Sequence, residues 1–189
     1  MTQPLTLDQE GYKAMLDGQL DIMAKLWAQH KPDGWKYGCL EELVQKEGRF
    51  FSSKPYTSEE KVILKKLAGE VGLCHAKTCY YTTFLGTVAN VPGVEYAEGF
   101  GLGRIHFPVD HAWLVLNDKA VDFTWGGKLQ GRGALPERLV ERAEKNLSEN
   151  VYKGVIIPRK TVLAHAVTTR TASSVLVGWL RYGGTGGLL

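Results

Sequence analysis

The sequence predicts an α+β fold, in which a helical first third is followed by a strand-rich segment. Apolar residues recur at helical spacing through residues 6 to 72, and alternating strand patterns dominate residues 93 to 125. Between these regions, a short apolar helix begins at Cys79. We therefore expect this helix to present Cys79 against an antiparallel sheet.

The first predicted helix covers residues 6 to 30. Thr6 and Gln9 form a capping-box pattern, and the pair Pro32–Asp33 followed by Gly34 predicts the end of the helix. Its apolar face consists of residues at spacings of three or four: Tyr12, Leu16, Leu20, Met23 and Trp27. Gly11 and Gly18 weaken the pattern without interrupting it.

Two further helices are expected before residue 73. The shorter covers Cys39 to Lys46, and the GRFF segment after it is a candidate first strand. The longer begins with a capping box formed by Thr57 and Glu60 and ends at Gly72. Its predicted apolar face consists of Val62, Ile63, Leu67 and Val71.

Cys79 lies at the predicted start of a helix. Thr78 is a plausible N-cap, and the apolar positions after Cys79 keep helical spacing up to the breakers Pro92 and Gly93. The free N–H groups and partial positive charge at a helix N-terminus favour a thiolate and a developing oxyanion, and Lys77 adds positive charge. Cys79 is therefore a candidate nucleophile, with Cys74 as the second choice.

Residues 93 to 103 read as a strand with two different faces. Val94, Tyr96, Phe100 and Leu102 fall on one face, where Glu98 would need a partner if buried. The other face carries Ala97 and three glycines, which would allow a packed helix or a substrate to approach the backbone. The packed helix is the favoured reading. Residues 104 to 110 are expected to form a loop bordering the site.

The segment HAWLVLNDKAVDFTW, residues 111 to 125, predicts a β-hairpin. Asn117 and Asp118 tolerate the positive φ angles of a two-residue turn. If Leu116 pairs with Lys119, side-chain alternation places His111, Trp113, Asp122 and Thr124 on one face. His111 and Asp122 are then diagonal neighbours, within reach of a hydrogen bond.

Cys79, His111 and Asp122 together have the residue types of a nucleophile, a base and an orienting acid. Taken alone, a cysteine among aromatic residues is more often a small buried side chain, and a histidine at a strand start is more often a satisfied polar residue. Their order on suitable elements favours a cysteine-dependent enzyme.

The rest of the chain completes a single predicted domain, residues 1 to 189. A helix is expected from Leu135 to Leu147, with charged residues on its solvent face. VLVGWLRY could be a strand or a helix, and the glycine-rich end reads as a flexible tail. The expected parts are a helical region at about 1–72, a Cys-helix and sheet core at about 73–158, and a C-terminal element with its tail at 159–189.

The motifs CYYTTF, YAEGFGLG, HAWLVLNDKAVDFTW and YKGVIIP resemble a group of small, mostly phage and bacterial proteins of the transglutaminase-like and papain-like cysteine-hydrolase class. The resemblance covers about residues 74 to 158. It implies Cys79 as nucleophile, His111 as base and Asp122 as the orienting residue. Phe123 stands where a proline is common, and Thr82 where an asparagine often follows the cysteine.

The composition limits which classes of partner and which compartment are expected. The net charge is only +3, and 23 basic and 20 acidic residues are interspersed, so nucleic acid is not the expected partner. No apolar run predicts a membrane span or signal segment, and three cysteines suit a reducing compartment, so we expect a cytoplasmic protein, in the host cytoplasm if phage-encoded. Cys74, His75 and Cys79, with His106 or His111, could be imagined as zinc ligands, but they lack the paired spacing of a zinc site, and no cofactor is expected.

The expected chemistry is acyl transfer on a protein or peptide substrate, as a peptidase, amidase, deamidase or cross-linking transferase. A groove walled by Trp113, Tyr96 and Trp125 is expected to bind the substrate. The alternative is a non-catalytic protein of the same fold that binds and inhibits a host protein or sequesters a small molecule. Intact Cys79, His111 and Asp122 favour the enzyme.

Overall fold

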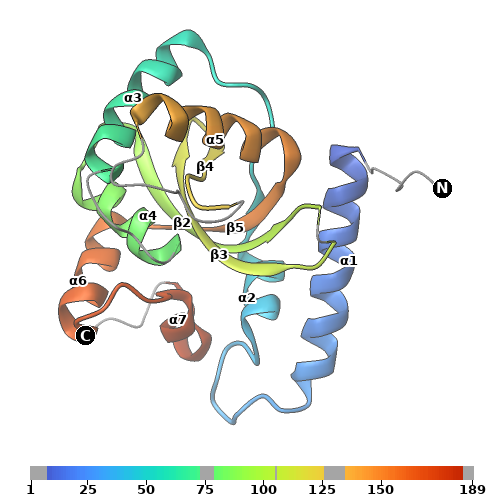
Figure 1. Cartoon of the computed structure of the whole chain (residues 1–189). Coiled ribbons are helices and arrows are strands. Elements are labelled where there is room, and N and C mark those ends of the chain that lie inside the picture. Colours follow the sequence, from blue (N-terminus) through green and yellow to red (C-terminus); the bar gives the residue numbers. More distant parts are fainter. Residues whose placement is uncertain (1–7, 73–78, 105, 126–134, 185–189) are drawn as a thin grey trace.

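The computed structural model of the chain has an α+β fold (Figure 1). It describes residues 8–72, 79–104, 106–125 and 135–184. The helices within this part of the chain are α1 (Gln9–Ala28), α2 (Leu40–Glu47), α3 (Ser58–Gly72), α4 (Cys79–Val88), α5 (Pro136–Glu149), α6 (Arg159–Thr169) and α7 (Leu176–Tyr182). The strands are β1 (Arg49–Phe50), β2 (Val94–Leu102), β3 (Val109–Leu116), β4 (Lys119–Val121) and β5 (Val151–Ile157).

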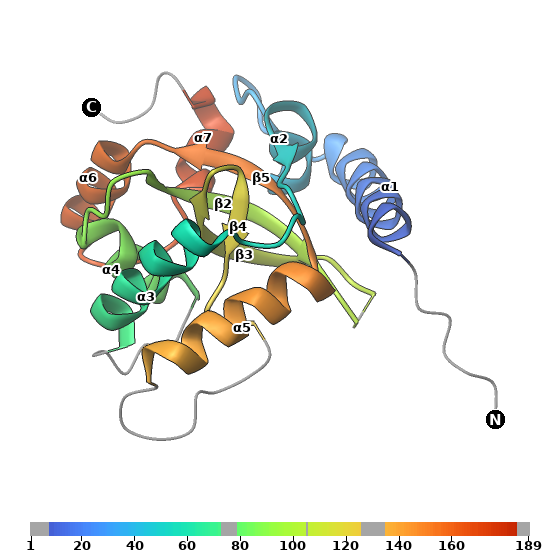
Figure 2. The same cartoon turned by 90° about the horizontal axis from the view of Figure 1, so that it is seen from above.

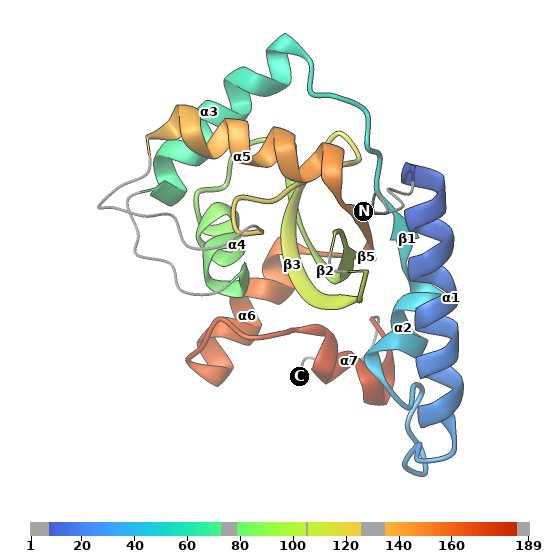
Figure 3. The same ribbon diagram turned by 45° about the vertical axis from the view of Figure 1, so that its right-hand side comes forward.

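The five strands form one antiparallel sheet in the order β1-β5-β2-β3-β4. The sheet curls strongly, as Figure 3 shows for β2 and β3. Its two edges approach each other just after β1, where the Ser52 N–H donates to the Asp118 carbonyl at 2.8 Å and Ser52 bridges to Lys119. The curl gives the sheet an inner face that can enclose side chains.

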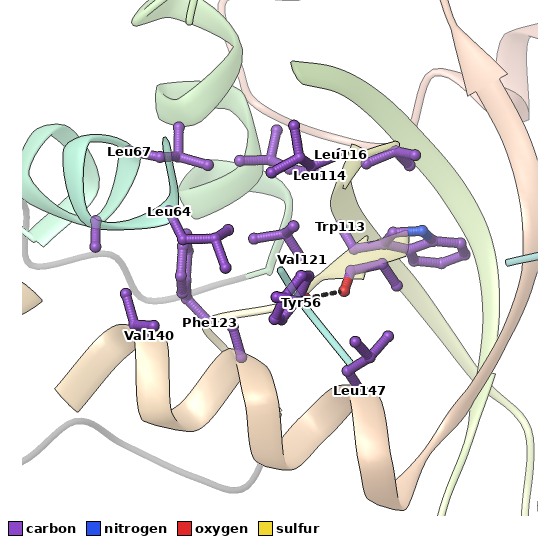
Figure 4. Packing of buried hydrophobic residues seen from close by; sticks show 14 of the residues in the cluster. Tyr56, Leu64, Leu67, Trp113, Leu114, Leu116, Val121, Phe123, Val140 and Leu147 are labelled. Atoms are coloured by element: carbon purple, nitrogen blue, oxygen red, sulfur yellow. Dashed lines mark hydrogen bonds between the residues drawn. The ribbon is translucent and has the colours of Figure 1, made fainter. Parts of the chain in front are cut away.

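Helices surround this sheet on several sides. Seen from above, α3, α4 and α5 lie along one side, while α7 and α2 lie on the opposite side (Figure 2). Two hydrophobic clusters result. The first packs Trp113 and Phe123 with residues of α3 and α5 (Figure 4), and the second packs α1, α2, α6 and α7 with β2 and Cys79.

Local capping signals explain where two helices begin. The Thr57 N–H donates to Glu60 Oε2 at 2.7 Å and the Glu60 N–H donates to Thr57 Oγ1 at 3.3 Å, which confirms the predicted capping box of α3. Helix α1 instead begins after Asp8, whose carboxylate accepts the Gly11 N–H at 2.7 Å. Thr6 lies outside the described residues.

Several other predicted elements change in detail. Val62 does not join the apolar face of α3, because it is 69% exposed, whereas Leu67 and Val71 are buried. The segment that could have been a strand or a helix is helix α7. The second hairpin strand ends at Val121, four residues before the predicted end at Trp125. Helix α6 lies in a segment for which no element was predicted.

Glu98 is a fully buried carboxylate that joins β2 to the start of α7. It accepts hydrogen bonds from the Tyr96 hydroxyl at 2.7 Å, Ser174 Oγ at 2.7 Å, and the N–H groups of Val175 and Leu176 at 2.9 and 3.1 Å. Burial raises the pKa of Glu98, although these four donors oppose the shift. The partner required for a buried Glu98 is therefore the C-terminal part of the chain.

Within the described residues, helices are all too short or too polar to cross a bilayer.

Candidate functional site

The hairpin that carries the predicted base and acid has the expected register. Leu116 pairs with Lys119 across a two-residue turn, and Asn117 and Asp118 both have positive φ angles, 48° and 67°. His111 Nε2 lies 2.8 Å from Asp122 Oδ2, and both side chains are buried. The predicted diagonal hydrogen bond is therefore present.

Asp122 belongs to a tight turn that follows β4. Its Oδ1 accepts the Thr124 N–H and the Thr124 hydroxyl, each at 2.7 Å, and the Trp125 N–H at 3.2 Å. An aspartate that accepts N–H groups two and three residues ahead forms an Asx-type turn, which ends the strand. These contacts fix one carboxylate oxygen and leave the other directed at His111.

The second oxygen of Asp122 is held by a residue that the sequence did not indicate. The Tyr152 hydroxyl on β5 donates to Oδ2 at 3.0 Å, and Asn150 donates to the Tyr152 oxygen at 3.4 Å. Asn146 of α5 donates to the Asp122 carbonyl at 2.8 Å. The carboxylate thus has a complete set of donors around it, although it is buried.

Cys79 is the first residue of α4, where the sequence placed it, and is partly exposed. Its side chain lies close enough to the His111 ring to raise the pKa of that ring. Because Nε2 of that ring faces Asp122, Nδ1 is the nitrogen left for Cys79. The structure therefore brings Cys79, His111 and Asp122 together. Lys77 and Thr78, predicted to assist Cys79, lie outside the described residues.

The electrostatics of the site favour a charged imidazole. Burial lowers the pKa of His111, but the charge and hydrogen bond of Asp122, with a smaller contribution from the Cys79 side chain, outweigh it and raise that pKa to about 10. Burial likewise raises the pKa of Asp122, but His111 and Thr124 lower it to about 2. His111 and Asp122 are therefore an ion pair at neutral pH.

The three aromatic residues predicted to wall a groove occupy different places. Trp113 has no exposed surface and stacks near the His111 ring at 6.3 Å between centroids, so it supports that ring from within the core. Trp125 packs edge-on against His111 at 5.0 Å and is partly exposed. Tyr96 faces the other side of the sheet, because its pair is Leu114 whereas His111 pairs with Gly99. It packs in the same cluster as Cys79.

The small residues of β2 make room for the site's own side chains. A Cβ on Gly101 would come 2.5 Å from Trp125 Cζ3, and a Cβ on Gly103 would collide with the Asn150 amide. The favoured expectation of a packed helix on this face is therefore wrong for these two positions, since an indole ring and an amide fill the space.

Among residues 8–72, 79–104, 106–125 and 135–184, no three His, Cys, Asp or Glu side chains gather as metal ligands would. Cys74 and His75, weighed as zinc ligands, lie outside these residues.

No protein family, curated protein or solved structure matches this chain.

Proposed function

We propose that this protein is a cysteine-dependent acyl-transfer enzyme in which Cys79 is the nucleophile, His111 the general base and acid, and Asp122 the orienting acid. One observation carries the proposal: the His111 ring hydrogen-bonds to the buried Asp122 carboxylate and also interacts with the Cys79 side chain. This is the arrangement that activates a thiol for nucleophilic attack. We further propose a fold of the transglutaminase or papain-like type.

The charges of the site support an activated thiol. An ordinary thiol has a pKa near 8.5, whereas the pKa of His111 is raised to about 10. An imidazolium next to a cysteine favours the thiolate form of that cysteine, which is the reactive nucleophile. Asp122 stabilises that imidazolium and fixes its orientation.

The reaction then follows in two balanced steps. The Cys79 thiolate attacks the carbonyl carbon of an amide or ester, and His111 gives its proton to the departing amine or alcohol, which leaves a thioester. In the second step His111 takes a proton from water or an amine as that molecule attacks the thioester, and the Cys79 thiolate departs. Water gives hydrolysis, and an amine gives transfer. A protein or peptide amide is the proposed substrate.

An activated ester tests this chemistry without knowledge of the natural substrate. We expect p-nitrophenyl acetate to give a burst of p-nitrophenolate with acetylation of Cys79, followed by slower turnover. Trypsin separates all three cysteines, because cleavage after Lys77 puts Cys74 and Cys79 in different peptides. Mass spectrometry of those peptides locates the acetyl group.

The matched variants are Cys79→Ala, which should lose the burst, and His111→Gln, which should lose most of its rate. A binding protein without turnover would acetylate its accessible thiols slowly, with no dependence on His111. That result would replace the enzyme by the binding protein of the same fold.

A further inference from the structure

The first turn of α4 is tied to the start of β3 by a hydrogen bond on one side of His111. The Tyr80 hydroxyl donates to Asp110 Oδ1 at 2.7 Å. Asp110 directly precedes His111 in β3. This hydrogen bond therefore links the residue after Cys79 to the residue before His111.

A second tie lies on the other side of His111. Thr83 Oγ1, one helical turn after Tyr80, donates to the Ala112 carbonyl at 3.1 Å, and both residues are buried. That carbonyl is available because the β3–β4 ladder ends at the pair of Leu114 with Val121. Peptide groups two residues apart on a strand point to the same edge of that strand. The Ala112 carbonyl therefore points to the β4 side of β3, at a position beyond the end of the β3–β4 ladder.

Helix α4 also approaches β3 closely along the same face. A Cβ on Gly86 would collide with Leu114 Cδ1, so a larger residue would require the Leu114 side chain to move. Tyr80, Thr83 and Gly86 are spaced by three residues and share one face of the helix. The face of α4 that follows Cys79 is thus fitted to the strand segment that carries His111.

We infer that Tyr80, Asp110 and Thr83 are positioning residues that hold the Cys79 thiol against the His111 ring. The inference rests on the proposed acyl-transfer function. Cys79 and His111 belong to separate elements, and Asp122 fixes only the histidine. The two ties on either side of His111 supply the missing constraint on the cysteine. A displacement of about 1 Å between reacting groups can cost up to about 100-fold in rate.

The test measures the rate of Cys79 alkylation by iodoacetamide between about pH 5 and pH 10, resolved by tryptic peptide. The variants are Tyr80→Phe, Asp110→Asn, their combination, and Thr83→Val, each checked for folding by circular dichroism. Two controls remove a hydroxyl of the same kind elsewhere. Thr87→Val loses a hydroxyl that bonds within α4, and Tyr37→Phe loses one that bonds to Glu47.

We expect each positioning variant to lower the rate near pH 6 about threefold to tenfold, with little change where every thiol is ionised. The effects of Tyr80→Phe and Asp110→Asn on the rate should not be additive, because both substitutions remove the same hydrogen bond. The two controls should match the wild-type profile.

Wild-type profiles in all three positioning variants would overturn the inference, provided that His111→Gln loses the reactivity near pH 6. An equal loss at every pH would also overturn it, since that indicates changed access to the thiol. If the wild-type protein and His111→Gln gave the same profile, the proposed function itself would be wrong.

Discussion

Replacing Asp122 with Asn should leave the fold intact and remove the assistance that His111 gives to Cys79. The substitution is nearly isosteric, but its amide has one acceptor and one donor where the carboxylate has two acceptors. In the structure, Oδ1 accepts three donors, two of which are the backbone N–H groups of Thr124 and Trp125. Those backbone donors cannot reorient, so the Asn oxygen must take the Oδ1 place.

The amide nitrogen then occupies the place of Oδ2, 2.8 Å from His111 Nε2. An N–H group there requires Nε2 to be an acceptor, which fixes a neutral imidazole with its proton on Nδ1. The nitrogen that faces Cys79 would then be a donor and could not take the thiol proton. Without the carboxylate, burial also lowers the pKa of His111.

The size of the effect follows from the reacting form of the thiol. An unassisted thiol with a pKa near 8.5 is about 0.3% thiolate at pH 6, so full proton transfer to His111 raises that fraction by up to about 300-fold. A stabilised thiolate is intrinsically less nucleophilic, which reduces the gain in rate to about 10-fold to 100-fold. Alkylation of Cys79 by iodoacetamide near pH 6 should therefore fall by this factor in Asp122→Asn.

The matched control is Asp118→Asn on the same hairpin. Asp118 is exposed and pairs with Arg49, and asparagine tolerates its positive φ angle. The Asp118→Asn substitution removes one negative charge at a residue that does not contact His111. If Asp122→Asn kept wild-type reactivity near pH 6 in a folded protein, Asp122 would be structural and another group would orient His111.

Three further outcomes are expected. Cys79 should alkylate faster than Cys39 at about pH 6 to 7 in peptide-resolved labelling, because burial raises the pKa of Cys39 to about 11; equal rates would contradict this. Trp113→Ala should lower the free energy of unfolding by about 3 to 5 kcal/mol in urea titrations, since the indole is fully buried, and a cost below about 1 kcal/mol would show that the core re-forms without it. The raised pKa of His111 should stabilise the fold fully below its ordinary value of 6.5 and lose that contribution as pH rises through about 10. The lowered pKa of Asp122 should stabilise the fold fully above its ordinary value of 3.8, and this contribution should be lost as the pH falls through about 2. Unfolding midpoints measured against His111→Gln should therefore differ most near pH 5 to 6 and converge toward pH 10, whereas a constant difference would show no linkage.

The pairing of His111 with Asp122 could be predicted because it depends on local information. A two-residue turn fixes the register, and the register fixes which side chains share a face. The early end of β4 could also have been predicted from the sequence. Thr124 follows Asp122 by two residues, and an aspartate in that position often accepts a hydrogen bond from its own chain.

Tyr152 could not be found in the same way. It reaches Asp122 because β5 pairs with β2, so that Tyr152 lies beside Gly101. Nothing in the sequence near Tyr152 specifies which strand becomes its neighbour. The donors to Glu98 were missed for a related reason, since periodicity did not distinguish a strand from a helix in the segment that holds Val175 and Leu176.

The attachment of Glu98 to residues 174–176 has a consequence for synthesis of the chain. During translation β2 emerges long before α7, so until those residues leave the ribosome the Glu98 carboxylate lacks three of its four donors. A buried carboxylate without donors is costly, so the second hydrophobic cluster, which contains Cys79, cannot close around it. A nascent chain stalled before residue 174 should thus expose that cluster, and the segment around Cys79 should become protected from proteolysis only when α7 has emerged.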